Sequence, residues 1–170
     1  MRKTLDELLD YIQPQPYIVH SENYNHLFKT PVLTAGQTFV LGKTNETDGI
    51  YTASKINPII LFDDFTTACK WVDFPFKVKS SACKIIIPKT GTNIRYCYYA
   101  MKSIKFDAFQ HKRYWISQYS KLGIPSYGPQ KENLIVDSLD CISSLIEKKK
   151  AEISSLDSLV KSRFSGEVRV

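Results

Sequence analysis

Two adjacent carboxylates, Asp63 and Asp64, are the residues of this sequence best suited to catalysis, because paired carboxylates can bind a divalent metal ion. A metal-dependent nuclease would need a third acid or a lysine at a useful spacing, and none follows. The position of the pair ahead of Thr66 and Thr67 instead favours a turn or a helix cap. The histidines are too few and too scattered for a metal site, standing at His20, His26 and His111. We therefore expect neither a metal ion nor another cofactor.

Part of a phosphate-binding loop is present at Gly42-Lys43-Thr44, but the complete motif is not. That loop needs a glycine where this chain has Gln37. The sequence also lacks the glycine-rich turn of dinucleotide-binding proteins, the serine motif of hydrolases and the Asn/Asp-Pro-Pro-Tyr/Phe motif of methyltransferases. Because no catalytic constellation is assembled, we predict that the chain is not itself an enzyme.

The four cysteines are predicted to be free and mostly buried thiols. Their separations of 14, 14 and 44 residues are too wide for the short pairs that hold zinc, the positions being Cys69, Cys83, Cys97 and Cys141. The N-terminal residues lack the apolar segment of a secretory signal. No apolar run approaches the ~20 residues of a membrane helix. These observations predict a cytoplasmic protein with no membrane partner.

The first 128 residues have the pattern of an α+β, β-rich globular domain. A capping box at Thr4 and Glu7 is expected to start a short helix, which reaches Ile12 and is stopped by Pro14. Short strands are then predicted at residues 17–20, 32–34, 38–41, 50–53, 58–62, 70–73 and 82–87. A second helix is expected over residues 93–104, and an extended or short helical element over residues 112–119.

Beyond Gly128 and Pro129 the spacing of apolar residues changes and predicts one long helix. The steps alternate between four and three residues, which is the heptad pattern of a coiled coil. The resulting seam has Lys149 at one position and apolar residues at the others: Ile135, Leu139, Ile142, Ile146, Ile153, Leu156 and Val160. We assign residues 129–165 to this helix and residues 166–170 to a tail. Residues 133–163 would extend about 46 Å as a helix and cannot cover their own seam, so a partner helix is favoured over packing along the chain's own domain.

Positive charge is concentrated in the middle third of the chain. The net charge is +6, yet residues 66–131 carry 12 lysines and arginines against the two acids Asp73 and Asp107. Residues 1–65 carry more acids than bases, and residues 133–170 are balanced. A field of this size favours polyanions, although a solvated basic surface is the alternative. Aromatic residues are interleaved with these bases, which suits nucleic acid, but at this density most are expected in the core.

Several long runs resemble one class of target-recognition domain in type I restriction–modification specificity subunits. These runs are residues 30–44 (TPVLTAGQTFVLGKT), 58–67 (PIILFDDFTT), 70–74 (KWVDF) and 76–82 (FKVKSSA). The heptad helix that follows Ile124-Pro125 and Gln130 resembles the spacer helix of that family and ends at 156–164 (LDSLVKSRF). This chain reads Ser126-Tyr127-Gly128-Pro129 where the family often has a proline-rich stretch, which should alter the hinge only.

The resemblance implies a subunit that reads DNA for other subunits. Family members usually carry two recognition domains and two antiparallel spacer helices, whereas this chain has one of each and no internal repeat. It therefore resembles a half-subunit, a truncated product or one excised half of a subunit. Its implied partners are double-stranded DNA, a methyltransferase subunit, a restriction subunit, and a second copy or another specificity half joined through the helix.

The resemblance and the needs of DNA binding together suggest a set of contact residues. Lysine and arginine serve phosphate contacts, for which we expect Lys77, Lys79, Lys84, Lys112 and Arg113. Short polar side chains on loops serve base contacts, for which we expect Gln37, Thr38, Thr44, Asn45 and Thr67. The same clusters also contain Lys43, Lys70 and Ser80.

Three other functions are carried as alternatives. A nuclease using Asp63 and Asp64 would cleave DNA by itself in the presence of Mg²⁺. A pure assembly protein would dock a partner through its helix and bind DNA without regard to sequence. The chain could also be the specificity component of a related fused restriction–methylation enzyme.

Overall fold

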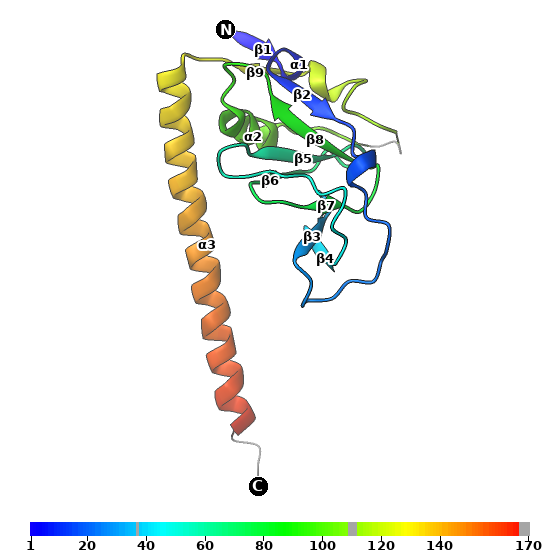
Figure 1. The fold of residues 1–170 in the computed structure, drawn as a ribbon. Coiled ribbons are helices and arrows are strands. Elements are labelled where there is room, and N and C mark those ends of the chain that lie inside the picture. The colour runs from blue at the N-terminus through cyan, green and yellow to red at the C-terminus, as the bar shows by residue number, and fades with distance from the viewer. Residues whose placement is uncertain (37, 109–111, 167–170) are drawn as a thin grey trace.

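The computed structural model describes residues 1–36, 38–108 and 112–166. It shows a mixed domain of three small sheets and a few short helices, from which one long helix projects (Figure 1). The α+β class predicted from the sequence is confirmed.

The first residues form a strand, one helical turn and a second strand: β1 (Arg2–Thr4), α1 (Leu5–Leu8) and β2 (Leu9–Ile12). The capping box is present, with the backbone N–H of Thr4 donating to Glu7 Oε2 at 2.6 Å. The predicted helix to Ile12 is wrong beyond its first turn. Residues Leu9–Ile12 instead pair antiparallel with β8 (Cys83–Pro88), because that strand offers a ladder of hydrogen bonds and a place to bury Leu9.

The central sheet has the strand order β2-β8-β5-β6, where β5 is Ile59–Asp63 and β6 is Cys69–Val72. These strands and β8 confirm the predictions for residues 58–62, 70–73 and 82–87. Alternate residues of β5 enter two different cores, with Ile60 on one face and Leu61 on the other. The sheet is therefore covered on both faces, and its short apolar runs follow from that burial.

A second sheet has the order β4-β3-β7, formed by β3 (Thr30–Leu33), β4 (Val40–Thr44) and β7 (Lys77–Val78). The strand predicted at residues 17–20 is wrong, because Pro14 and Pro16 favour a 3-10 turn, η1 (Gln15–Tyr17). Only a bridge between Ile18 and Val78 follows it. The strand predicted at residues 50–53 is likewise reduced to one bridge.

Helix α2 (Ile94–Ser103) confirms the helix predicted at residues 93–104, and the Asn93 side chain accepts a hydrogen bond from the Tyr96 N–H. Aromatic residues of the basic block pack beneath it around Trp115 and Tyr119, so they belong mostly to the core. Residues 119–121 form η2 (Tyr119–Lys121), and β9 (Gly123–Pro125) pairs with β1 as a third sheet. All four cysteines are free, and Cys83 and Cys97 are buried.

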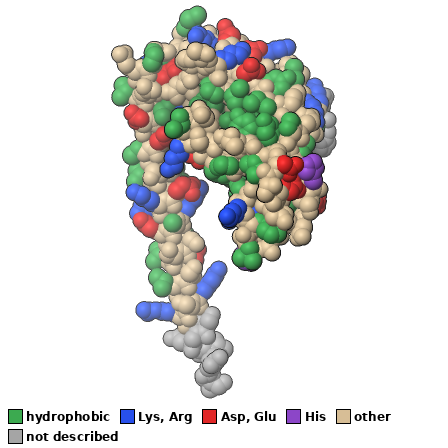
Figure 2. Space-filling view, in the orientation of Figure 1, with side chains coloured by type: hydrophobic (Ala, Val, Ile, Leu, Met, Phe, Trp, Pro, Cys, Tyr) green, Lys and Arg blue, Asp and Glu red, His purple; other side chains and the backbone are tan. Residues whose placement is uncertain are grey.

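Helix α3 (Pro129–Gly166) packs against the domain along its first part, up to Asp140 and Ser143. Ile135 and Val136 pack on the core around α2, whereas every side chain from residue 144 to residue 163 is exposed. Figure 2 shows apolar side chains along this free part and open space between it and the domain. None of the helices in the described part of the chain has the length and apolar character needed to span a bilayer.

Candidate nucleic-acid interface

Four loops meet at one end of the central sheet, where β5 ends and β8 begins. We call residues 34–36, 38–39, 63–68, 79–82 and 112–115 the loop cluster. Backbone hydrogen bonds join its parts: the Lys79 N–H donates to the Leu33 carbonyl, the Asp64 N–H to the Ala82 carbonyl, and the Tyr114 N–H to the Asp64 carbonyl. Segments far apart in the sequence thus form one surface, as loops do when a sheet positions them.

The loop between β5 and β6 is shaped by Asp63, whose Oδ1 accepts hydrogen bonds from the N–H groups of Phe65 at 2.8 Å and Thr66 at 2.9 Å. The turn predicted from the sequence is therefore confirmed for Asp63. Thr67 follows with a φ of 60°, a left-handed conformation that is uncommon for a β-branched residue. Such strain persists only where the surroundings impose it, and it often accompanies function.

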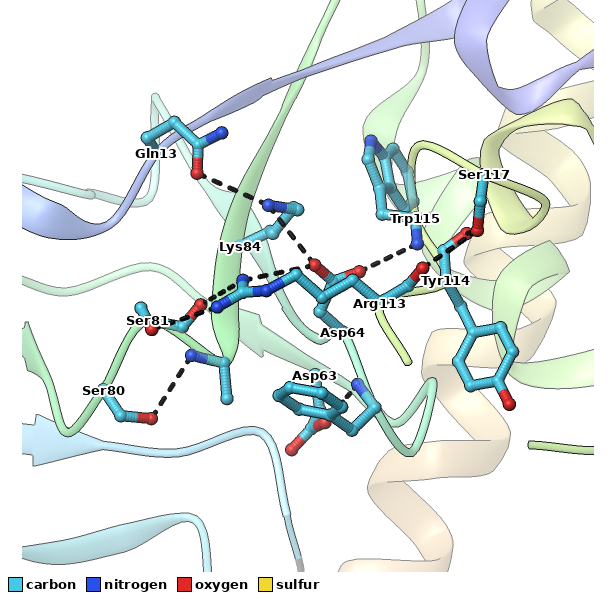
Figure 3. A network of polar contacts seen from close by, with 12 residues as sticks. Gln13, Asp63, Asp64, Ser80, Ser81, Lys84, Arg113, Tyr114, Trp115 and Ser117 are labelled. Carbon is cyan, nitrogen blue, oxygen red and sulfur yellow. Dashed lines mark hydrogen bonds and ion pairs between the residues drawn. The ribbon is translucent and has the colours of Figure 1, made fainter. Parts of the chain in front are cut away.

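Asp64 lies under the loop cluster and is completely buried. Its Oδ1 accepts a hydrogen bond from the Trp115 N–H at 2.8 Å, and its Oδ2 lies 3.3 Å from Lys84 Nζ and 3.5 Å from an Arg113 guanidinium nitrogen (Figure 3). One carboxylate thereby joins its own loop to the segment 112–115 and to strand β8. Two cations neutralise it, and no group of three His, Cys, Asp or Glu residues in the described ranges could hold a metal ion. Asp64 is thus engaged inside the fold by a backbone N–H and two cations.

Arg113 is held at the surface of the cluster. Its guanidinium donates to the Ser81 carbonyl at 2.7 Å and to Ser81 Oγ at 3.1 Å, and it lies 5.5 Å from the centre of the Phe65 ring. About half of the side chain, 47%, remains exposed. Lys112 beside it is exposed. These two cations are therefore placed to meet a polyanion, one of them in a fixed orientation.

Two lysines expected to contact phosphate are buried, and the structure corrects that expectation. Lys77 is fully buried, 2.7 Å from Glu46 Oε2, and it donates to the Asp48 carbonyl at 2.9 Å. Lys84 is 2% exposed and forms an ion pair with Asp64. Neither ammonium group can reach a phosphate. The sequence does not reveal this, because lysine is almost always a surface residue unless it is paired.

The residues expected near the partial phosphate-binding loop are spread along the β3–β4 hairpin. Thr38 is exposed in the loop cluster, whereas Lys43 and Asn45 are exposed at the other end of β4. Thr44 is buried, and its Oγ1 accepts a hydrogen bond from the Glu46 N–H, so it is corrected to a structural residue. Gln37 lies outside the described residues.

The remaining predicted contacts lie at or near the cluster. Lys79 is ion-paired with Glu22 and 31% exposed, and Ser80 Oγ accepts a hydrogen bond from the Ala82 N–H. Lys70 is half-buried on β6. The sequence did not indicate that Ser81 holds Arg113. The residues Ser80-Ser81 carry no pattern that predicts a hydrogen bond to a side chain 32 positions away.

Solved structures define the class of this fold. The chain is similar to a type I restriction–modification system S subunit from M. genitalium, with a TM-score of 0.70 over 99% of this chain and 46% of that protein, at 18% identity. The HsdS subunit from Thermoanaerobacter tengcongensis matches with a TM-score of 0.55 at 13% identity, over 89% of this chain and 39% of that one. At these identities the likeness establishes the fold: a specificity-subunit domain with its long helix.

The sequence comparison identifies a particular relative. The chain is 45% identical over 161 residues to the specificity subunit of the type I restriction enzyme EcoR124I/EcoR124II from Escherichia coli. The match covers 88% of this chain and 40% of that protein, so the chain spans about two fifths of the relative's length. No family model matches the chain. The resemblance stated from the sequence is confirmed: the chain is related to one part of a type I specificity subunit.

Proposed function

We propose that the chain is a non-catalytic DNA-recognition component of a type I restriction–modification system and reads one half of a bipartite site. Residues 1–128 are the recognition domain, residues 129–165 are the spacer helix, and residues 166–170 are a tail. The observation that carries this proposal is the 45% identity with a specificity subunit, which extends over 161 residues and so includes most of the domain and helix.

The loop cluster is the proposed DNA face. Lys112, Arg113 and Lys79 are exposed or partly exposed cations on neighbouring loops, which suits them to phosphate contacts. Thr38, Thr67 and Ser80 supply short polar side chains for base edges on the same loops, and Gln37 keeps this role on sequence grounds alone. Lys43, Asn45 and Lys70 flank the cluster and would contact a longer stretch of duplex.

The seam of α3 favours an antiparallel partner of the same sequence. Its seven apolar positions and Lys149 are spaced identically when read in either direction from the midpoint between Glu147 and Lys148. Antiparallel pairing in this register places Ile142 against Ile153 and Lys149 against Ile146 of the second copy. Parallel pairing would instead place Lys149 against Lys149, a like-charge contact that costs stability. A second specificity half with a similar seam would pair in the same way.

A methyltransferase subunit and a restriction subunit are the proposed enzymatic partners. The relative is a specificity subunit of a restriction enzyme, so catalysis in such an enzyme can reside in other chains. In the acid pair Asp63-Asp64, Asp63 caps a turn and Asp64 is paired with Lys84 beneath the loop cluster. A cytoplasmic location follows from a genomic DNA target and is proposed with it.

A selection from a pool of random 40-base-pair duplexes tests the proposal. The full chain, alone and with the methyltransferase subunit of its host, should enrich one bipartite motif with a gap of fixed length. Two half-sites of the same sequence in opposite orientation are expected for a homodimer. Enrichment of no motif under either condition would show that the chain does not read DNA sequence.

A further inference from the structure

The contact between α3 and the domain ends in a polar cluster that joins three elements. Arg95 of α2 donates from Nε to Asp140 Oδ1 of α3 at 2.8 Å, and its terminal nitrogen also reaches that oxygen. Tyr99 of α2 donates its hydroxyl hydrogen to the same carboxylate, and its oxygen lies 3.3 Å from Ser143 Oγ. Helix α3 is thereby tied to α2 at two positions one turn apart.

Aromatic rings fix the direction of the Arg95 side chain. The guanidinium carbon lies 4.4 Å from the centre of the Trp71 ring on β6, and 5.0 Å and 5.4 Å from the rings of Tyr99 and Tyr98. Stacking of this kind suits the planar guanidinium and limits its rotation. Partial burial would raise the pKa of Asp140, but hydrogen bonds from Arg95 and Tyr99 outweigh burial and lower that pKa.

The tie is the last contact before α3 leaves the domain. Upstream, Ile135 and Val136 make apolar contacts, and Asn93 donates to Asn133 at 2.9 Å. Beyond Ser143 a cleft of about 500 Å³ opens between α2 and α3, and the helix continues with all its side chains exposed to residue 163. Apolar contacts are not directional, whereas hydrogen bonds have a preferred geometry, so the polar contacts at Asp140 are suited to set the direction of the helix.

A small change in the direction of α3 at Asp140 displaces the C-terminal end of the helix by a large distance. About 23 residues separate Asp140 from Arg163, a span of roughly 35 Å at ~1.5 Å per residue. A rotation of about 10° therefore moves the end of the helix by roughly 6 Å. This displacement is nearly two steps of DNA, since one base pair rises by ~3.4 Å.

We propose that Arg95 and Asp140 are positioning residues that fix the direction in which α3 leaves the recognition domain, and thereby the length of the gap between two half-sites. The effect on the gap between half-sites rests on the proposed function. The effect on the direction of α3 does not depend on it. Neither residue touches DNA in this account, and each acts through the position of a whole domain.

The direction of the helix can be measured without DNA. Spin labels on Asp10→Cys of β2 and Ser158→Cys of α3, in a full chain with Cys141→Ser and diluted with unlabelled chain, report one distance across the tie. The parent chain should give a narrow distribution, and both Asp140→Ala and Arg95→Gln should broaden or shift it while circular dichroism is unchanged. Asp137→Ala, an exposed acid one turn earlier, is the matched control and should leave it narrow. An unchanged distribution in both tie variants would overturn the proposal.

The consequence for DNA is tested by the same random-duplex selection. Asp140→Ala should enrich the parent's half-site sequences with gap lengths spread over at least two adjacent values, whereas Asp137→Ala should keep the single gap. An unchanged single gap in Asp140→Ala would overturn the role in spacing. Absence of any motif with the parent chain would instead contradict the proposed function, and the spin-label distances would still decide the role of the tie.

Discussion

The carboxylate of Asp64 and the ammonium group of Lys84 lie 3.3 Å apart beneath the loop cluster, and both side chains are almost completely shielded from water. Two buried charges are costly unless they are paired and hydrogen-bonded. Here the pair is completed by the Trp115 N–H, by Gln13 at 3.4 Å from Lys84 Nζ, and by Arg113. The pair therefore supports the surface that we propose to face DNA.

Replacement of Asp64 by Ala should destabilise the fold by about 3–5 kcal/mol, because Lys84 would be left buried without its partner. Urea unfolding of the full chain measures this loss. The double variant Asp64→Asn with Lys84→Met should lose less than the sum of its single variants, because both charges are then absent. Asp137→Ala, at an exposed position, should change stability by less than about 0.5 kcal/mol. Additive losses in the double variant would contradict the pairing.

Glu46 is the partly buried partner of the buried Lys77, and it predicts sensitivity to acid. Partial burial would raise its pKa, but hydrogen bonds from Lys77 and from the N–H groups of Ser21 and His20 outweigh burial and hold the pKa below its ordinary value. The stability from this lowered pKa is present above the pKa of the unfolded chain and is lost as pH falls through the folded value.

The unfolding free energy of the parent should therefore fall between about pH 5 and pH 3. Glu46→Gln should be less stable at pH 7 and should lose less on acidification, because its side chain does not titrate. Urea unfolding at four pH values compares the two slopes. Equal slopes for the parent and the variant would show that Glu46 does not carry this dependence.

The exposed seam of α3 predicts self-association. Ile142 is 51% and Ile146 49% exposed in the single chain, although both are branched apolar residues at heptad positions. The parent should sediment as a dimer at tens of micromolar, and Ile142→Gln with Ile146→Gln should sediment as a folded monomer. Ser144→Gln with Lys148→Gln, on the opposite side of the helix, should remain dimeric. A monomeric parent would leave another specificity half, or the methyltransferase subunit, as the partner of the seam.

Much of the fold could be predicted from local sequence. Strands β5, β6 and β8 and helix α2 are within one residue of their predicted bounds, because each is a short apolar run between turn residues or a capped amphipathic segment. The pairing of Arg2–Thr4 with Gly123–Pro125 was not predictable, since three-residue strands 121 positions apart carry no periodic signal. Leu9–Ile12 forms a strand instead of the predicted helix, because pairing with β8 outweighs a helical pattern of only two turns.

The candidate site was harder to predict than the fold. The sequence predicts that the basic block favours a polyanion as partner, and Lys112 and Arg113 remain suited to that role. It could not separate them from Lys77 and Lys84, because burial of a lysine depends on where distant acids such as Glu46 and Asp64 are placed. The hydrogen bond between Arg95 and Asp140 could not be predicted for the same reason, because the two residues are 45 positions apart in the sequence.

Sequence-dependent binding of the full chain to DNA tests the central claim most directly. Fluorescence anisotropy at several salt concentrations compares the duplex preferred in the selection with a scrambled duplex of the same composition. The preferred duplex should bind more tightly than the scrambled duplex at every salt concentration. Lys79→Ala with Lys112→Ala should weaken both duplexes equally and flatten the slope of log K against log salt by about 0.9 per lost phosphate contact. Lys131→Ala, an exposed residue in the first turn of α3 and outside the loop cluster, is the matched control and should leave the slope unchanged. Equal affinity of the parent for the preferred and scrambled duplexes, with and without the methyltransferase subunit, would contradict the account.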